Sequence, residues 1–169
     1  MINDINHIRK LILVRHGKSD WDNNLSDRER PILPRAHKDA KLVATEFKKH
    51  FSEPIHLVSS VAKRAKQTAQ IFENELSEQA TTFLLNENLY TFDVLELVTF
   101  IRKLPDQWQN VMIFGHNPAF TSVHQFLSHK RIDHIPTTGL VYLEFENLDT
   151  WKKAKYGKNK LELYAKQLR

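Results

Sequence analysis

The chain has 169 residues, of which 41% are hydrophobic and 27% are charged, and its formal net charge is +5. This composition is typical of a globular protein, and the length suits one compact unit, so we expect a single domain over residues 1–169. Cysteine is absent, which excludes disulfides, thiolate catalysis, iron–sulfur clusters and cysteine-based zinc sites.

Short apolar runs alternate with amphipathic segments along most of the chain. In chain order, the patterns predict a strand at 10–15, an irregular polar stretch at 21–33, a helix at 34–50, a strand at 55–59, a helix at 62–76, a strand at 81–85, a helix at 93–104, a strand at 110–115, a helix at 118–127, a strand at 139–146 and a short strand at 161–166. Asp93 and Asn117 are natural N-caps, and Pro118 suits the first helical position. The alternation predicts an α/β protein, a three-layer α/β/α sandwich with a mostly parallel central sheet and an antiparallel pair at its C-terminal end.

The four glycines, Gly17, Gly115, Gly139 and Gly157, exclude two classes of nucleotide site. Neither a GxGxxG dinucleotide fingerprint nor a GxxxxGK[ST] phosphate loop can be assembled from these positions. No apolar run approaches 18 residues, and the N-terminal residues are too polar for a signal peptide. We therefore expect a cytoplasmic protein with no membrane partner.

The positive charge is concentrated near the C-terminus. Residues 1–150 carry 18 basic and 19 acidic side chains, whereas residues 151–169 carry seven basic side chains against Glu162 alone. The interpretation we favour is a solvated, lysine-rich loop and edge strand, because lysines protect exposed sheet edges. Nucleic-acid binding is the alternative, but no nucleic-acid motif accompanies the charge.

Unusual polar residues follow three of the predicted strands. Arg15, His16 and Gly17 follow the first, Ser59, Ser60 and Arg64 follow the second, and Gly115, His116 and Asn117 follow the strand at 110–115. In an open α/β sheet these positions meet at one edge, where ligands bind. Two arginines suit a phosphoryl dianion, one histidine can attack phosphorus, and the second, if protonated, adds positive charge. No acidic cluster indicates a metal, so we expect neither a metal nor another cofactor.

These residues resemble the motifs of a known family. The segment 13–21, LVRHGKSDW, resembles the N-terminal signature of the histidine phosphatase superfamily, whose members share the phosphoglycerate mutase-like fold. The segments 59–69, SSVAKRAKQTA, and 114–118, FGHNP, resemble its second and third motifs. The RHGKSDW motif and the segment Arg30-Pro-Ile-Leu-Pro-Arg35 make the sequence most similar to SixA-type phosphohistidine phosphatases.

The resemblance implies roles for these residues. His16 would be the nucleophile, and Arg15, Arg64 and His116 would bind the phosphoryl group and stabilise its transition state. Gly17, Lys18 and Ser19 directly follow the nucleophile and are further candidates for substrate binding.

Two positions bear on how the leaving group is protonated. Asn117 stands where acid phosphatases of this fold carry an aspartate, so that proton donor is missing. Glu87 lies in the region where mutase-type members place a catalytic glutamate, and it is either a catalytic acid or a solvated loop residue.

The sequence thus predicts a metal-independent phosphatase that forms a phosphohistidine intermediate. An imidazole leaving group needs no strong acid, which favours phosphohistidine on a protein, such as a histidine phosphotransfer domain. The alternatives are a general phosphomonoesterase acting on small phosphoesters and a non-catalytic module that binds phosphoproteins.

Overall fold

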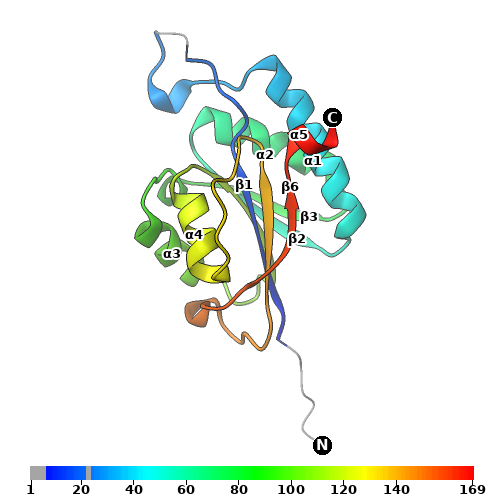
Figure 1. Ribbon diagram of the computed structural model, residues 1–169, viewed down its shortest axis with the longest axis vertical. Coiled ribbons are helices and arrows are strands. Elements are labelled where there is room, and N and C mark those ends of the chain that lie inside the picture. Colours follow the sequence, from blue (N-terminus) through cyan, green and yellow to red (C-terminus); the bar gives the residue numbers. More distant parts are fainter. Residues whose placement is uncertain (1–6, 22–23) are drawn as a thin grey trace, which may run out of the picture.

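A six-stranded mixed sheet forms the centre of the protein, as the computed structural model of residues 7–21 and 24–169 shows (Figure 1). Its strands are β1 (Arg9–Arg15), β2 (Ile55–Ser60), β3 (Ala80–Asn86), β4 (Asn110–Gly115), β5 (Leu140–Phe145) and β6 (Lys158–Leu163). They lie in the order β3-β2-β4-β1-β5-β6. Neighbouring strands from β3 to β1 are parallel, whereas β5 is antiparallel to both β1 and β6. The predicted mostly parallel sheet and antiparallel C-terminal pair are confirmed.

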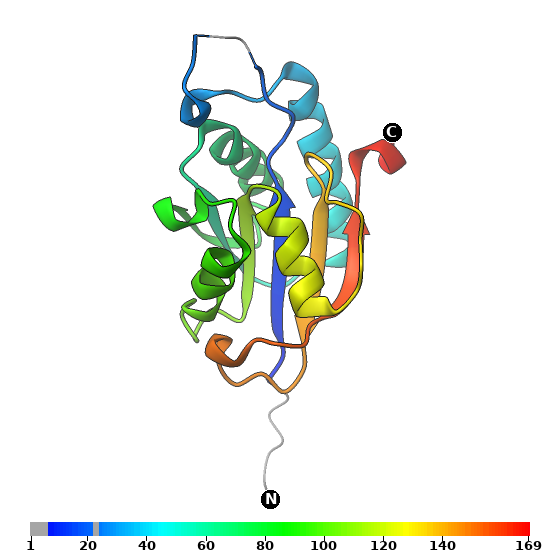
Figure 2. The ribbon, with the colours of Figure 1, turned by 60° about the vertical axis from the view of Figure 1, so that its left-hand side comes forward.

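Helices cover both faces of the sheet (Figures 1 and 2). They are α1 (Pro34–His50), α2 (Lys63–Glu75), α3 (Val94–Arg102), α4 (Ala119–Ser128) and the short α5 (Ala165–Leu168). Alternation along β1 separates two cores, because successive side chains of a strand point to opposite faces. Leu11 and Leu13 pack with α3 and α4, while Ile12 and Val14 pack with α1, α2 and α5. The α/β/α sandwich is therefore confirmed.

Several boundaries differ from the predictions. The strand predicted at 161–166 instead covers Lys158–Leu163, because Leu163 pairs with Leu140 at the start of β5 and the chain then turns into α5. Helix α4 begins at Ala119, so Pro118 and not the predicted Asn117 is its N-cap. The Asn117 side chain, one residue earlier, still accepts a hydrogen bond from the backbone N–H of Thr121 at 3.1 Å. Asp93 caps α3 as predicted. Three short 3-10 helices were not predicted: η1 (Asp27–Glu29), η2 (Glu87–Leu89) and η3 (Trp151–Lys153).

Three connections meet at the carboxyl end of the parallel strands. The His16 N–H donates to the Gly115 carbonyl at 3.0 Å, and the Thr138 N–H donates to the carbonyls of Arg15 and His16, each at 3.1 Å. The two histidine-bearing turns are thus bonded to each other and to the loop before β5. Over residues 7–21 and 24–169, no helix has the length and apolar character needed to cross a membrane.

Candidate active site

Four side chains singled out from the sequence meet at this edge of the sheet. Arg15 ends β1 and His16 follows it, Arg64 lies in the first turn of α2, and His116 follows β4. The imidazole rings of His16 and His116 lie 5.3 Å apart between centroids, and an Arg64 amino group lies 3.4 Å from Nδ1 of His116. Residues up to 101 positions apart in the sequence therefore form one cluster.

The contacts of His16 determine which of its nitrogens is free. Its Nδ1 lies 2.8 Å from the Gly17 carbonyl oxygen, which can only accept, so Nδ1 carries the proton. The lone pair of the neutral ring is then on Nε2. Burial, together with the charges of Arg64 and Arg15, lowers the pKa of His16 from 6.5 to about 3. At neutral pH the ring is therefore an uncharged potential nucleophile.

His116 is held in the opposite tautomer. Its Nδ1 faces Arg64, which can only donate, so Nδ1 accepts and Nε2 carries the proton. Nε2 then donates to the Ser60 hydroxyl at 2.8 Å. Burial, with the nearby His16 and Arg64, lowers the pKa of His116 to about 3, so the ring is neutral at neutral pH. A positive charge on this residue would require a bound anion that raises its pKa.

Three arginines, rather than the predicted two, surround the site. Arg30, from the loop before α1, is 6% exposed, and Arg64 is 2% exposed. The Nε atoms of Arg15, Arg30 and Arg64 are all buried without a hydrogen-bond partner. A buried donor without a partner is costly, and an anion supplies acceptors for donors of this kind.

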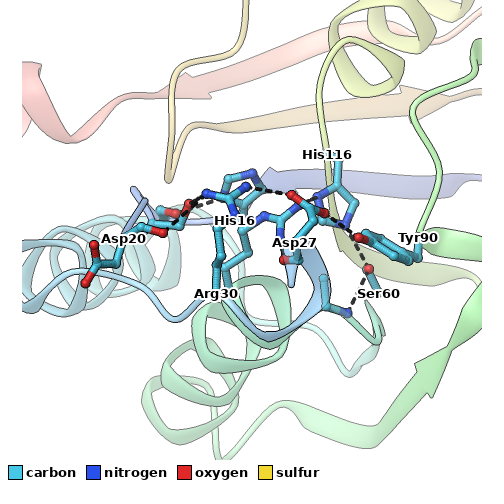
Figure 3. A network of polar contacts seen from close by, with 11 residues as sticks. His16, Asp20, Asp27, Arg30, Ser60, Tyr90 and His116 are labelled. Carbon is cyan, nitrogen blue, oxygen red and sulfur yellow. Dashed lines mark hydrogen bonds and ion pairs between the residues drawn. The ribbon is translucent and has the colours of Figure 1, made fainter. Parts of the chain in front are cut away.

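Asp27 contacts two of these guanidinium groups, and Figure 3 shows it within the polar network of the site. Arg64 donates to the Asp27 carbonyl at 2.6 Å and to its carboxylate at 3.0 Å, and Arg30 donates to the other carboxylate oxygen at 2.8 Å. The Tyr90 hydroxyl also donates to this carboxylate. Partial burial works to raise the pKa of Asp27, but hydrogen bonds from Tyr90, Arg30 and Arg64 outweigh it and hold that pKa well below its usual range. An ionised carboxylate therefore occupies donors of the most buried arginine.

The cluster opens into a pocket of about 450 Å³. Its lining is cationic and aromatic and consists of Arg15, His16, Lys18, Ser19, Trp21, Asp27, Arg30, Arg64, Phe92, Asn117 and Thr137. Two exposed aromatic residues stand at its mouth: Trp21 stacks on the Arg30 guanidinium at 3.7 Å, and Phe92 packs against the His116 ring at 5.3 Å. His116 is fully buried behind this lining.

Of the predicted site residues that follow His16, two line the pocket and one does not. Lys18 and Ser19 line the pocket, with Lys18 exposed and the Ser19 hydroxyl accepting from Arg30 at 2.5 Å. Gly17 directs its N–H to the Thr68 hydroxyl at 2.9 Å, and an added Cβ would lie 3.0 Å from that of Ala36. Gly17 is therefore closely packed and is not among the residues that line the pocket.

Glu87 is not among the residues that line the pocket. Its carboxylate is exposed and pairs with Arg28 at 2.6 Å. This ion pair joins η2 to η1.

Trp21, Asp27, Arg30 and Phe92 line the pocket but were not predicted as site residues. Arg30 begins the segment 30–35 that resembles SixA-type phosphatases, so the sequence did contain a signal for this residue. Asp27 lies in the stretch at 21–33, which the sequence predicted only to be irregular. Among the described residues, no group of three or more histidines, aspartates and glutamates is placed to hold a metal ion.

Comparison with protein families identifies the chain. The model of the histidine phosphatase superfamily (branch 1) matches residues 11–110, which contain His16 and Arg64 and more than half of the chain. The chain belongs to the histidine phosphatase superfamily. It is accordingly a phosphatase. No curated protein matches the chain.

Solved structures of this superfamily share the fold. The protein histidine phosphatase SixA, complexed with tungstate, superposes with a TM-score of 0.79 at 19% identity, covering 95% of this chain and 99% of that one. A SixA protein from Nakamurella multipartitia gives 0.77 at 18% identity, with 93% and 96% covered. A mycobacterial glucosyl-3-phosphoglycerate phosphatase gives 0.67 at 12% identity, with 91% and 98% covered.

Proposed function

We propose that this phosphatase removes the phosphoryl group from phosphohistidine on a protein, through a phosphohistidine intermediate on His16. The lining of the pocket supports this proposal most directly. Among the described residues, Asp27 is the only carboxylate in that lining, and its contacts keep it ionised. The described part of the lining thus offers no carboxylic acid to protonate a leaving group.

The first step would be attack of His16 Nε2 on phosphorus. The hydrogen bond to the Gly17 carbonyl holds the ring in the tautomer that leaves Nε2 unprotonated, and the lowered pKa keeps it so. A new P–N bond forms at Nε2 while the bond from phosphorus to the substrate breaks, and the electron pair goes to the departing atom. Nδ1 keeps its proton and its bond to Gly17 throughout.

The leaving group distinguishes the candidate substrates. When the second ring nitrogen of a phosphohistidine carries a proton, the ring leaves as neutral imidazole without a further donor. An alkoxide leaving from an alkyl phosphate is strongly basic and needs a proton in the transition state. A pocket whose one carboxylate among the described lining residues is ionised therefore favours the phosphoramidate. Glu87 would act as an acid only after leaving Arg28.

Charge compensation would come from the arginines and His116. Arg15 and Arg64 carry fixed charge and planar arrays of donors that match phosphoryl oxygens. A bound dianion raises the pKa of His116, so that this ring can share the developing negative charge. Water would then attack the phosphorylated His16, the P–Nε2 bond would break, and phosphate would leave.

The test compares substrates that differ in their leaving group. We would measure phosphate release from a phosphohistidine protein, p-nitrophenyl phosphate and β-glycerophosphate, with EDTA present, using the wild type and His16→Ala. We expect fast release from phosphohistidine, slower release from the aryl ester and very slow release from the alkyl ester, all lost in the variant. A phosphorylated wild-type enzyme should be trapped that is stable to alkali and labile to acid.

Other results would select the alternatives. Equal rates on the alkyl ester would indicate a general phosphomonoesterase and direct attention to Glu87. Binding of the phosphoprotein without turnover would indicate a non-catalytic module. Release that survives His16→Ala would refute the proposed nucleophile.

A further inference from the structure

A second depression, of about 280 Å³, adjoins the catalytic pocket. It shares Lys18 and Thr137 with that pocket, so the two form one continuous surface. Its other walls come from the start of α1 and from α5, which lie near each other in Figure 1. The C-terminal end of the chain is thereby brought beside the site.

Four cations surround this depression and form what we call the basic rim: Lys18, Arg35, Lys166 and Arg169. All four are exposed. Among the described residues, Asp39 is the one side-chain carboxylate in this lining, and it pairs with Arg169 at 2.8 Å, so the side chains give a net charge of +3, from four cations and one anion. Arg35 lies 3.9 Å from the same carboxylate and is 68% exposed, which leaves its donors largely in water.

A second surface beside the catalytic pocket has the opposite sign. Phe92 lines both that pocket and a shallow neighbouring surface that carries Asp93 and Glu96. Of these two neighbouring surfaces, only the basic rim matches by charge an acidic flank on a partner whose phosphorylated residue enters the pocket.

We propose that the basic rim is the docking surface for an acidic flank of the phosphorylated protein substrate. This inference rests on the proposed function and specifies the partner by charge. A cationic surface beside the pocket attracts an acidic partner during diffusion and orients it once bound. The same surface disfavours substrates with a basic flank.

The structure also separates the basic C-terminal segment into distinct places. Lys166 and Arg169 belong to the rim, Lys158 and Lys160 lie on edge strand β6, and Lys152 lies on η3. In Figure 1, η3 (orange) and α5 (red) are at opposite ends of the sheet. The segment therefore supplies a lysine in the rim, Lys166, whose substitution tests the docking surface, and a lysine far from the rim, Lys152, whose substitution is the control.

The experiment uses two double charge reversals of equal size. Arg35→Glu with Lys166→Glu alters the rim, and Lys152→Glu with Lys155→Glu alters the region near η3. A glutamate at position 35 lies in the first turn of α1, where negative charge suits a helix. The probes are three phosphohistidine peptides that differ only in three flanking residues, which are glutamate, glutamine or lysine. Hydrolysis of p-nitrophenyl phosphate reports on the chemistry.

We expect the wild type at low salt to prefer the glutamate peptide to the glutamine peptide by about tenfold in kcat/KM, and the lysine peptide to be the poorest. The rim variant should lose this preference while keeping its rate on p-nitrophenyl phosphate. The control variant should keep both. Added salt should weaken the preference of the wild type. No preference in the wild type, or an equal loss in both variants, would overturn the proposal.

Binding separates this inference from the proposed function. Fluorescence anisotropy of the labelled, unphosphorylated glutamate peptide measures docking without turnover. If no phosphohistidine peptide is hydrolysed but this peptide binds and the rim variant weakens it, the proposed substrate is wrong and the acidic docking surface stands. If the phosphorylated peptides are hydrolysed without regard to their flanks, the docking surface is wrong and the proposed function stands.

Discussion

The two buried histidines of the active site should make stability depend steeply on pH. Burial lowers the pKa of His16 and of His116 from 6.5 to about 3. Between these values the unfolded chain binds protons that the folded chain does not, so acid favours unfolding. Their contribution to stability is therefore present above pH 6.5 and is lost as the pH falls towards 3.

The size of the effect follows from the two pKa values. One pH unit corresponds to about 1.4 kcal/mol for each such group, and pH 5 lies 1.5 units below the value of 6.5 in the unfolded chain. Each histidine should therefore remove about 2 kcal/mol from the free energy of unfolding between pH 7 and pH 5, and the pair about 4 kcal/mol. This is a large part of the roughly 5–15 kcal/mol that stabilises a typical domain.

The assay is urea unfolding of the wild type and of His16→Asn with His116→Gln, at pH 7 and pH 5. Asparagine keeps a donor near the Gly17 carbonyl, and glutamine keeps one near Ser60. We expect the difference between the two pH values to be about 4 kcal/mol smaller in the double variant. A control, His37→Asn, removes a histidine that is exposed on α1 and should keep the wild-type difference. If the free energy of unfolding falls as much between pH 7 and pH 5 in the double variant as in the wild type, the reasoning is refuted.

Three further substitutions test individual residues. Ser60→Ala removes the acceptor for His116 Nε2, so kcat should fall about tenfold, and the unpaired buried donor should cost about 1–3 kcal/mol of stability in urea unfolding. Gly115→Ala places a Cβ 2.7 Å from the Phe120 ring, so the same assay should show a loss of about 1–3 kcal/mol. Asp27→Asn removes a carboxylate that competes with anions for the arginines, so inorganic phosphate should inhibit about 3- to 10-fold more strongly in steady-state assays.

Neighbouring residues provide matched controls for two of these. Ser59→Ala removes a buried hydroxyl that donates to the Ser60 carbonyl and not to His116, so kcat should be retained. Equal losses of kcat in the two serine variants would contradict a positioning role for Ser60. Glu29→Gln neutralises an exposed carboxylate in the same short helix as Asp27 and should leave phosphate inhibition unchanged. Weaker inhibition in Asp27→Asn would mean that Asp27 holds its arginines in place rather than competing for them. An unchanged unfolding midpoint in Gly115→Ala would show that the Phe120 ring yields without cost.

Local patterns in the sequence determined the elements and the central residues of the site. Alternating apolar runs and amphipathic segments predicted the strands and helices, because burial on one face requires those periods. Residues that directly follow parallel strands meet at one edge by topology alone. Arg15, His16, Arg64 and His116 could therefore be brought together before any coordinates were known.

Contacts between distant segments decided the rest. Asp27 reaches Arg64 across 37 positions and Tyr90 across 63, and no local period records such pairings. The tautomers and the neutral state of the histidines depend on burial and on the carbonyl, hydroxyl and guanidinium groups around them. The basic C-terminal segment is continuous in sequence, yet the antiparallel pairing of β5 with β6 brings only its last residues to the depression beside the catalytic pocket. Charge along a chain becomes charge on a surface only once the fold determines which side chains share a face.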